Sequence, residues 1–128
     1  MTKEQTQKKI LIIEDEKPLA HALSLKLTHE GFEVMTTGSG EEGATLLAQN
    51  TFALILTDLI IPGQDGFKIL EALQAKKVKI PVIVMTNLNQ EEDKKRATGL
   101  GATAFFVKSN STLTEIVESV KKLAHNEV

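Results

Sequence analysis

The most informative residue of this chain is a carboxylate at the end of an apolar run. Asp58 follows residues 52–57 (FALILT) and precedes residues 59–66 (LIIPGQDG). Buried parallel strands read as continuous apolar runs, and open α/β sheets bind ligands beyond the carboxyl ends of such strands. The Pro-Gly and Asp-Gly pairs of residues 59–66 predict a tight turn before the next helix. A carboxylate held at that point can serve as a metal ligand, as a nucleophile, or as both.

Further carboxylates follow another apolar run, because Glu14 and Asp15 come directly after residues 10–13. If they converge on Asp58, the three charges repel one another unless a cation lies nearby. A hard divalent cation with oxygen ligands, such as Mg²⁺, would resolve the repulsion. The strand-end loops contain no His or Cys, which disfavours zinc. For Glu14 and Asp15 taken alone, ordinary solvated loop positions remain an equally simple interpretation.

Two more residues stand at predicted strand ends. Thr86 ends the run 82–86 and Lys108 follows the run 104–107. A lysine in that place must pair with a carboxylate, for which Asp58 is the expected partner, or draw the strand end into water. Phosphoryl transfer requires a positioned nucleophile, a metal, a hydroxyl donor and a fixed cation around one point, so the set as a whole predicts that chemistry.

The elements that must position these residues are apolar strand-like runs that alternate with helix-like segments. This order predicts an α/β fold, a flavodoxin-like doubly wound five-stranded parallel sheet with five helices. The strand order 2-1-3-4-5, one of the common orders of such sheets, places the first and third strands side by side. The second strand, which alternates most in polarity, is expected at the edge. The expected strands are 10–13, 33–37, 52–57, 82–85 and 104–107.

Helix boundaries are marked by residue types with known preferences. Pro18 suits the first turn of the first helix and Gly31 its end. Ser39 with Glu42, and Thr112 with Glu115, have the spacing of capping boxes for the second and fifth helices. The third and fourth helices are expected over 66–74 and 90–100, and an apolar period of 3.6 residues runs through 113–123.

Composition narrows the class of protein. The chain has 128 residues, 41% of them hydrophobic, with no cysteine and a net charge of −2. It lacks the stretch of about 18 to 20 apolar residues that spans a bilayer, and its polar N-terminus lacks a signal core. We therefore expect a cytoplasmic domain over residues 9–125, a frayed tail over residues 1–8, and no direct contact with nucleic acid or membrane. The basic cluster 94–96 is interpreted as a solvated helix face.

The site residues and the D-x-x-x-P-G-x-D-G turn after Asp58 resemble the receiver domain of two-component response regulators, including chemotaxis regulators, over nearly the whole chain. Glu14 and Asp15 look like the acidic pair of that family, and Asp58 like its phosphoacceptor. Thr86, Phe105 and Lys108 match the switch hydroxyl, the switch aromatic residue and the lysine.

The resemblance implies a phosphorelay function in signal transduction. Asp58 would accept a phosphoryl group from a phosphohistidine of a sensor histidine kinase or phosphotransfer protein, and the domain itself would catalyse both the transfer and the later hydrolysis. Mg²⁺ would be bound by Asp15, Asp58 and the backbone carbonyl of Ile60, with Glu14 acting through a water. Lys108 would hold one phosphoryl oxygen and Thr86 another.

The resemblance also implies a conformational switch. The movement of the Thr86 hydroxyl would vacate space into which the Phe105 ring rotates, although Phe105 is equally compatible with plain core packing. The change would be transmitted to an unknown downstream protein through the face of the fourth helix, fifth strand and fifth helix.

The chain departs from the family pattern in several places. Ser109 replaces the usual proline after the lysine, and because a cis bond before a non-proline residue costs about 2.5 to 4 kcal/mol, we expect a trans bond or a rearranged loop. Asn87 stands where a small residue is usual, and Phe105 replaces a frequent tyrosine. Ile60 and Leu88 flank the path of an attacking water and cannot orient it, which predicts a long-lived phosphorylated state.

Other functions fit the sequence less well than that of a phosphoacceptor. A pseudo-receiver, a binding module not regulated by phosphorylation, typically lacks one of the site residues, and this chain has them all. A related phosphatase would carry a second aspartate where Ile60 stands, and a flavin-binding module would not place residues 14–17 (EDEK) at a phosphate loop. The sequence is compatible with a stand-alone receiver and with a fragment of a longer regulator.

Overall fold

The computed structural model describes residues 8–61, 64–75 and 79–125. Five parallel strands form the central sheet in the order β2-β1-β3-β6-β7. Counted along the chain as the five strands of this sheet, that order is 2-1-3-4-5, so the predicted topology is confirmed. The strands are β1 (Lys9–Ile13), β2 (Glu33–Thr37), β3 (Leu54–Thr57), β6 (Val82–Thr86) and β7 (Ala104–Val107).

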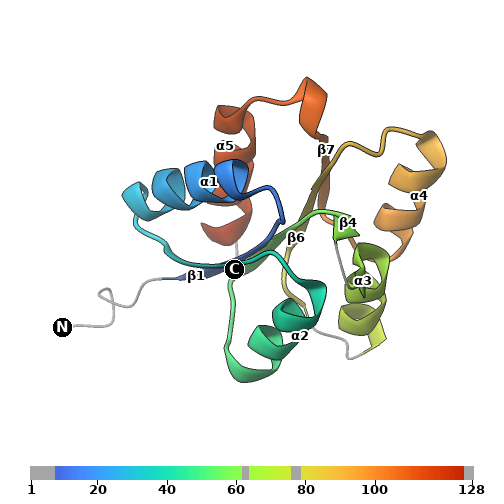
Figure 1. Cartoon of the computed structure of the whole chain (residues 1–128), viewed down its shortest axis with the longest axis horizontal. Coiled ribbons are helices and arrows are strands. Elements are labelled where there is room, and N and C mark those ends of the chain that lie inside the picture. The colour runs from blue at the N-terminus through green and yellow to red at the C-terminus, as the bar shows by residue number, and fades with distance from the viewer. Residues whose placement is uncertain (1–7, 62–63, 76–78, 126–128) are drawn as a thin grey trace.

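Helices cover both faces of the sheet (Figure 1). One face packs against α1 and α5, and the other against α2, α3 and α4. All five predicted helices are present, and each predicted boundary lies within one or two residues of the observed one. They are α1 (Lys17–His29), α2 (Gly40–Gln49), α3 (Gly66–Ala75), α4 (Glu91–Gly99) and α5 (Leu113–His125).

The two faces of the sheet bury separate apolar clusters because successive strand residues point to opposite sides. In β1, Ile10 and Ile12 face the α1 and α5 side, whereas Leu11 and Ile13 face the other helices. β3 and β6 are buried along their whole length and β1 is buried after Lys9, whereas β2 lies at the edge and pairs with β1. Full burial on both faces explains why these runs carry no polar alternation.

Local signals account for most helix ends. Pro18 lies in the first turn of α1, and Gly31 after it has φ of 101°, a conformation that glycine adopts without strain. The Thr112–Glu115 capping box is reciprocal, with hydrogen bonds of 2.8 and 3.1 Å. The Ser39–Glu42 box is only half formed: Ser39 Oγ accepts from Glu42 N (3.2 Å), but the Glu42 carboxylate accepts from the Thr37 hydroxyl instead.

Some short elements were not predicted, and the first of them follows Asp58. A short antiparallel pair, β4 (Ile60–Ile61) and β5 (Gln64–Asp65), lies between Asp58 and α3. Pro62 and Gly63, which the sequence marks as the turn, lie outside the described residues. A Cβ at Gly66 would come within 2.5 Å of Leu59 Cα, so only glycine lets α3 begin this close to the segment that follows Asp58.

The described residues include no helix of the length and apolar character needed to cross a membrane. Of the tail predicted over residues 1–8, Lys8 alone lies in the described part of the chain. Its carbonyl accepts from Glu33 N (2.9 Å), and its Nζ donates to the Ala124 carbonyl (2.8 Å).

Candidate functional site

Three carboxylates meet at the carboxyl end of the sheet. Glu14 and Asp15 follow β1, Asp58 follows β3, and these two strands are paired so that Ile13 lies opposite Thr57. One oxygen from each carboxylate lies within 4.8 Å of the others. Glu14 and Asp58 are buried and Asp15 is exposed. The predicted convergence of acids from distant parts of the chain is therefore confirmed.

Lys108, the residue after β7, is the cation of this cluster. Its Nζ lies 2.7 Å from Asp58 Oδ2 and 2.7 Å from Glu14 Oε1. The predicted pairing with Asp58 is confirmed, and the lysine links the carboxylates that follow β1 and β3. Its Nζ also lies 3.1 Å from Glu16 Oε2, a contact that the sequence analysis missed.

The backbone that follows β3 orients the Asp58 carboxylate. Asp58 Oδ1 accepts hydrogen bonds from Leu59 N (2.6 Å) and Ile60 N (3.1 Å). The other oxygen, Oδ2, receives the Lys108 ammonium. The two oxygens of Asp58 thus have different environments, since one accepts from main-chain amides and the other from the Lys108 ammonium.

Glu14 is electrostatically the least satisfied member of the cluster. Burial raises the pKa of its carboxyl group above the ordinary value, an effect that Lys108 and the amide of Glu16 only partly oppose. Its Oε2 accepts from Glu16 N (2.8 Å). Its buried Oε1 is close enough to Lys108 for charge pairing, but no hydrogen bond of good geometry reaches it among the described residues.

Lys108 is held in its charged form. Burial alone would lower the pKa of its ammonium, but hydrogen bonds and charges from Asp58 and Glu14 outweigh burial, so the pKa lies well above the ordinary value. The lysine is therefore a permanent cation at the pH of any cell.

The chemistry of the donor set fits a hard cation. All side-chain donors are carboxylate oxygens, the type that Mg²⁺ and Ca²⁺ prefer. Lys108 contacts three of the acids here, Glu14, Glu16 and Asp58, and Asp15 adds a further carboxylate to the cluster. A buried carboxylate oxygen without a hydrogen bond is what a bound cation, or its water, would satisfy, and the exposed Asp15 leaves the cluster open to solvent.

The two predicted switch residues lie outside this cluster: Thr86 is at the carboxyl end of β6, and Phe105 is within β7, opposite Val84. Thr86 is fully buried at the end of β6, and its Oγ1 accepts from Leu88 N (3.3 Å). Within the described chain, no hydrogen bond joins Thr86 to Asp58. Phe105 is half-buried against the α2–α4 side of the sheet, and Phe106 packs on the opposite side, as the alternation predicted.

The segment after Lys108 has a defined backbone conformation although Ser109 replaces the usual proline. The described residues contain no cis peptide bond, so the Lys108–Ser109 bond is trans, and residues Lys108–Asn110 form a single 3₁₀ turn, η2. The expectation of a trans bond is confirmed.

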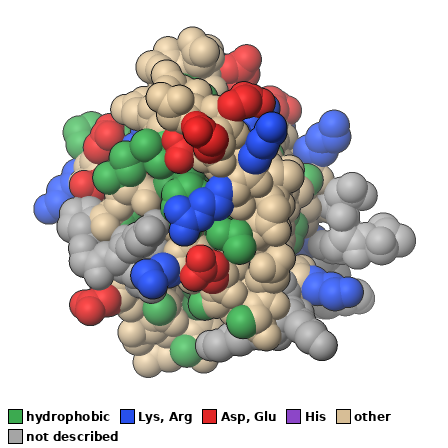
Figure 2. Space-filling view, turned by 90° about the vertical axis from the view of Figure 1, so that its right-hand side faces the viewer, with side chains coloured by type: hydrophobic (Ala, Val, Ile, Leu, Met, Phe, Trp, Pro, Cys, Tyr) green, Lys and Arg blue, Asp and Glu red, His purple; other side chains and the backbone are tan. Residues whose placement is uncertain are grey.

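The basic cluster 94–96 is exposed on α4, as predicted. Arg96, however, also contacts α3. The guanidinium of Arg96 lies 4.0 Å from the centre of the Phe67 ring, and its Nη2 lies 3.8 Å from Glu71 Oε2, both on α3. Acidic and basic side chains are mixed on the face shown in Figure 2, and apolar side chains appear there only in small separate areas.

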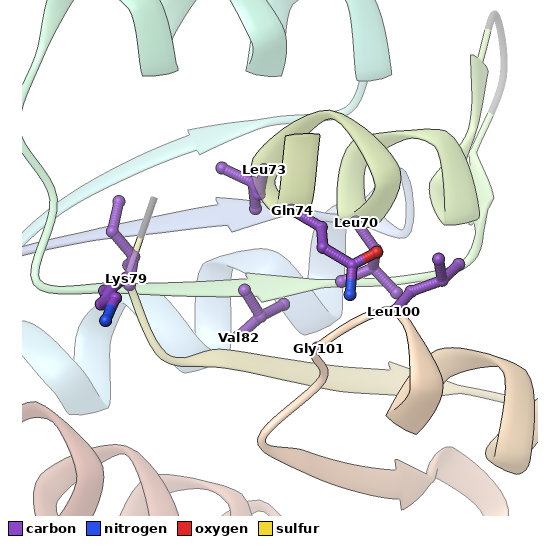
Figure 3. A pocket seen from close by; sticks show the side chains of 8 residues that line it. Leu70, Leu73, Gln74, Lys79, Val82, Leu100 and Gly101 are labelled. Carbon is purple, nitrogen blue, oxygen red and sulfur yellow. The ribbon is translucent and has the colours of Figure 1, made fainter. Parts of the chain in front are cut away.

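An apolar hollow of about 290 Å³ lies at the other end of β6 (Figure 3). Leu70 and Leu73 of α3, Val82 at the start of β6 and Leu100 after α4 line it. Lys79 is the charged residue among the described lining residues, which together offer no set of groups for acid–base or metal chemistry. The hollow is at the amino end of β6, whereas the acidic cluster lies at the carboxyl end of the sheet.

Comparison with known proteins assigns this architecture to a family. The sequence model of the protein family described as response regulator receiver domain matches residues 10–121 of this chain. The chain therefore belongs to the family of response regulator receiver domains and is a receiver of the two-component type.

A curated relative is the cell cycle response regulator CtrA of Brucella ovis, which is 37% identical over 100 residues, covering 78% of this chain and 43% of that protein. The chain thus spans less than half the length of the curated relatives it matches.

Solved receiver domains share the fold. The non-phosphorylated HemR receiver domain of Leptospira biflexa has a TM-score of 0.88 at 24% identity, covering 95% of this chain and 98% of that one. A CheY-like receiver domain protein of Methanospirillum hungatei has a TM-score of 0.86 at 24% identity, covering 93% and 94%. At these identities the likeness concerns the fold alone.

Proposed function

We propose that Asp58 accepts a phosphoryl group from the phosphohistidine of a sensor histidine kinase or phosphotransfer protein. The observation that carries the proposal is the Lys108 ammonium at 2.7 Å from a buried Asp58 oxygen, in a cluster with two more carboxylates. The receiver unit is taken as residues 9–125.

The two Asp58 oxygens suggest how the transfer proceeds. Oδ1 is held by two main-chain amides, which leaves Oδ2 as the nucleophile. Oδ2 forms a bond to phosphorus as the phosphorus–nitrogen bond of the donor breaks, and the electron pair returns to the imidazole. Lys108 then donates to a phosphoryl oxygen in place of Oδ2, because the negative charge has moved outward onto that group.

The carboxylates of Asp15 and Asp58 and the main-chain carbonyl of Ile60 are the groups we assign to Mg²⁺, with Glu14 acting through a bound water. When bound there, the ion neutralises charge on the phosphoryl oxygens. Between turnovers, these residues keep an oxygen-lined site beside the nucleophile. The same constellation serves the later hydrolysis of the acyl phosphate, which this domain catalyses for itself.

The switch is proposed to run through Thr86 and Phe105. The Thr86 hydroxyl exchanges its bond with Leu88 N for a phosphoryl oxygen, and the half-buried Phe105 ring moves into the space that is freed. The output surface is the face of α4, β7 and α5, which would bind a downstream protein in the cytoplasm. We propose no direct contact with nucleic acid or membrane for this domain.

The test is the intact mass of the protein after incubation with a small phosphodonor, with and without Mg²⁺. We expect a gain of one phosphoryl group that requires Mg²⁺ and is absent from Asp58→Ala. A protein that gains nothing under any condition would instead be a pseudo-receiver, and a gain that survives Asp58→Ala would move the phosphoacceptor to another residue.

A further inference from the structure

The side chain of Glu16 has a partner that its location at the start of α1 does not explain. Glu16 is the N-cap residue of α1, where a side chain normally accepts from the first helical amides, yet its side chain makes no capping hydrogen bond. The carboxylate instead reaches across the site to Lys108 Nζ (3.1 Å). Its side chain is 56% exposed, whereas the other two acids on this ammonium are buried.

Glu16 therefore occupies the solvent side of Lys108. An ammonium has three donor hydrogens, and three carboxylates surround this one: Glu14, Glu16 and Asp58. On phosphorylation, a phosphoryl oxygen takes the donor that Asp58 Oδ2 releases, so it binds Lys108 beside Glu16. Glu14 lies on the buried side of the ammonium, so Glu16 is the carboxylate that stands between Lys108 and solvent.

The Glu16 charge also lies close to the path of the incoming donor. Because one ammonium contacts both groups, Glu16 Oε2 and Asp58 Oδ2 are at most about 6 Å apart. We propose that Glu16 is a specificity-determining residue, which selects phosphodonors by charge and disfavours small anionic ones. The inference rests on the proposed phosphorylation of Asp58.

The size of the effect follows from Coulomb's law. Two unit charges about 6 Å apart, at effective dielectric constants of about 40 to 80, change a rate by roughly three- to ten-fold per unit of donor charge. Loss of Glu16 should thus favour a dianionic donor over a monoanionic one by about that factor. The preference should shrink at high salt, because the group is exposed and screened.

The experiment compares acetyl phosphate, a dianion, with phosphoramidate, a monoanion, at pH 7 and saturating Mg²⁺. In the first reaction the phosphorus–oxygen bond to acetate breaks, and in the second the phosphorus–nitrogen bond to ammonia breaks, while each forms the bond to Asp58 Oδ2. The variant is Glu16→Gln, which retains an oxygen for Lys108 and removes only the charge. Initial rates are read from intact mass.

The chain provides a matched control in Glu30→Gln. Glu30 is the C-cap residue of the same helix and also pairs with a lysine, since its Oε1 lies 3.2 Å from Lys121 Nζ. It is separated from Glu16 by the length of α1, about 20 Å. The control thus removes the same charge and also breaks a carboxylate–lysine pair, but at a distance from the site.

We expect Glu16→Gln to raise the ratio of the acetyl phosphate rate to the phosphoramidate rate by about three- to ten-fold, and Glu30→Gln to leave it unchanged. An unchanged ratio in Glu16→Gln, an equal fall in both rates, or the same change in the control would overturn the inference. A wild-type protein that neither donor phosphorylates would instead overturn the proposed function.

Discussion

The two ends of the central sheet differ in almost every physical respect. At the carboxyl end, the strands terminate in buried charges: Glu14 after β1, Asp58 after β3 and Lys108 after β7. At the amino end, Val82 opens β6 against Leu70 of α3 around an apolar hollow (Figure 3). One end is suited to chemistry, and the other contributes to the stability of the fold.

The contrast shows that the unfavourable electrostatic interactions of this fold lie at the carboxyl end of the sheet. The pKa of Glu14 is raised by burial, and its Oε1 lacks a hydrogen bond among the described groups, which a site selected for stability alone would not retain. The apolar contacts of the two clusters hold the strands in register on either side of these interactions. The comparison therefore predicts that stability and phosphorylation respond to different substitutions.

The largest expected effect is on stability at the amino end. Leu70→Ala should lower the free energy of unfolding by about 2–5 kcal/mol, because Leu70 is 1% exposed and its loss leaves a cavity. The measurement is urea denaturation, with Leu25→Ala, which is 58% exposed, as the control that should change little. If Leu70→Ala stopped phosphorylation of the folded fraction, the two ends would not be separable.

The next effect is on chemistry at the carboxyl end. Lys108→Ala should slow phosphorylation by about 10²–10³-fold, the typical consequence of removing a preorganised group that stabilises developing negative charge. The measurement is the initial rate of the gain in intact mass with a small phosphodonor. Lys121→Ala, in an exposed ion pair between α1 and α5, is the matched control and should retain the rate. A rate in Lys108→Ala within a factor of two or so of wild type would contradict the role given to this lysine.

A pH dependence follows from the raised pKa of Glu14. Folded Glu14 binds its proton more tightly than the unfolded chain does, so without Mg²⁺ its contribution lowers the free energy of unfolding as the pH rises above the ordinary value of 4.5. Glu14→Gln should remove this contribution. Urea midpoints at pH 5 and pH 7 would measure it, and equal pH dependence in both proteins would exclude Glu14 as its source.

Mg²⁺ should restore part of the stability that is lost as the pH rises. If it binds the folded carboxylate cluster, a concentration ten times the dissociation constant stabilises the protein by about 1.4 kcal/mol at pH 7. Chelation of the metal should restore the original midpoint of urea denaturation. Stabilisation of equal size in Asp15→Asn would place the ion outside this cluster.

The smallest effect concerns how long the phosphoryl group persists. Ile60 is 57% exposed beside Asp58, and Leu88 is half-buried after β6. Both side chains are apolar, so neither can orient an attacking water by a hydrogen bond. Combining Ile60→Asn with Leu88→Glu should speed the decay of phosphorylated protein by about ten-fold, less than a full general base provides. Decay at the wild-type rate in the double variant would remove the explanation.

The sequence predicted the fold and the main site residues because their signals are local. Apolar runs, Pro18 and Gly31 fix strands and helix ends within a few residues, and the parallel topology then brings Glu14 and Asp58 together. Glu16 was missed because the Lys108 contact joins residues 92 positions apart, and a third acid in a row looks like a solvated helix start. The β4–β5 pair was missed because two-residue strands have no periodicity.

The most direct test of the account is to find the residue that carries the phosphoryl group. Borohydride reduces an acyl phosphate to the alcohol, so that a phosphorylated aspartate becomes homoserine, and peptide sequencing by mass spectrometry then locates it. We predict homoserine at position 58, formed only after incubation with phosphodonor and Mg²⁺. Reduction at Asp15, or at neither residue in a protein that has gained phosphate, would contradict the assignment of Asp58 as the phosphoacceptor.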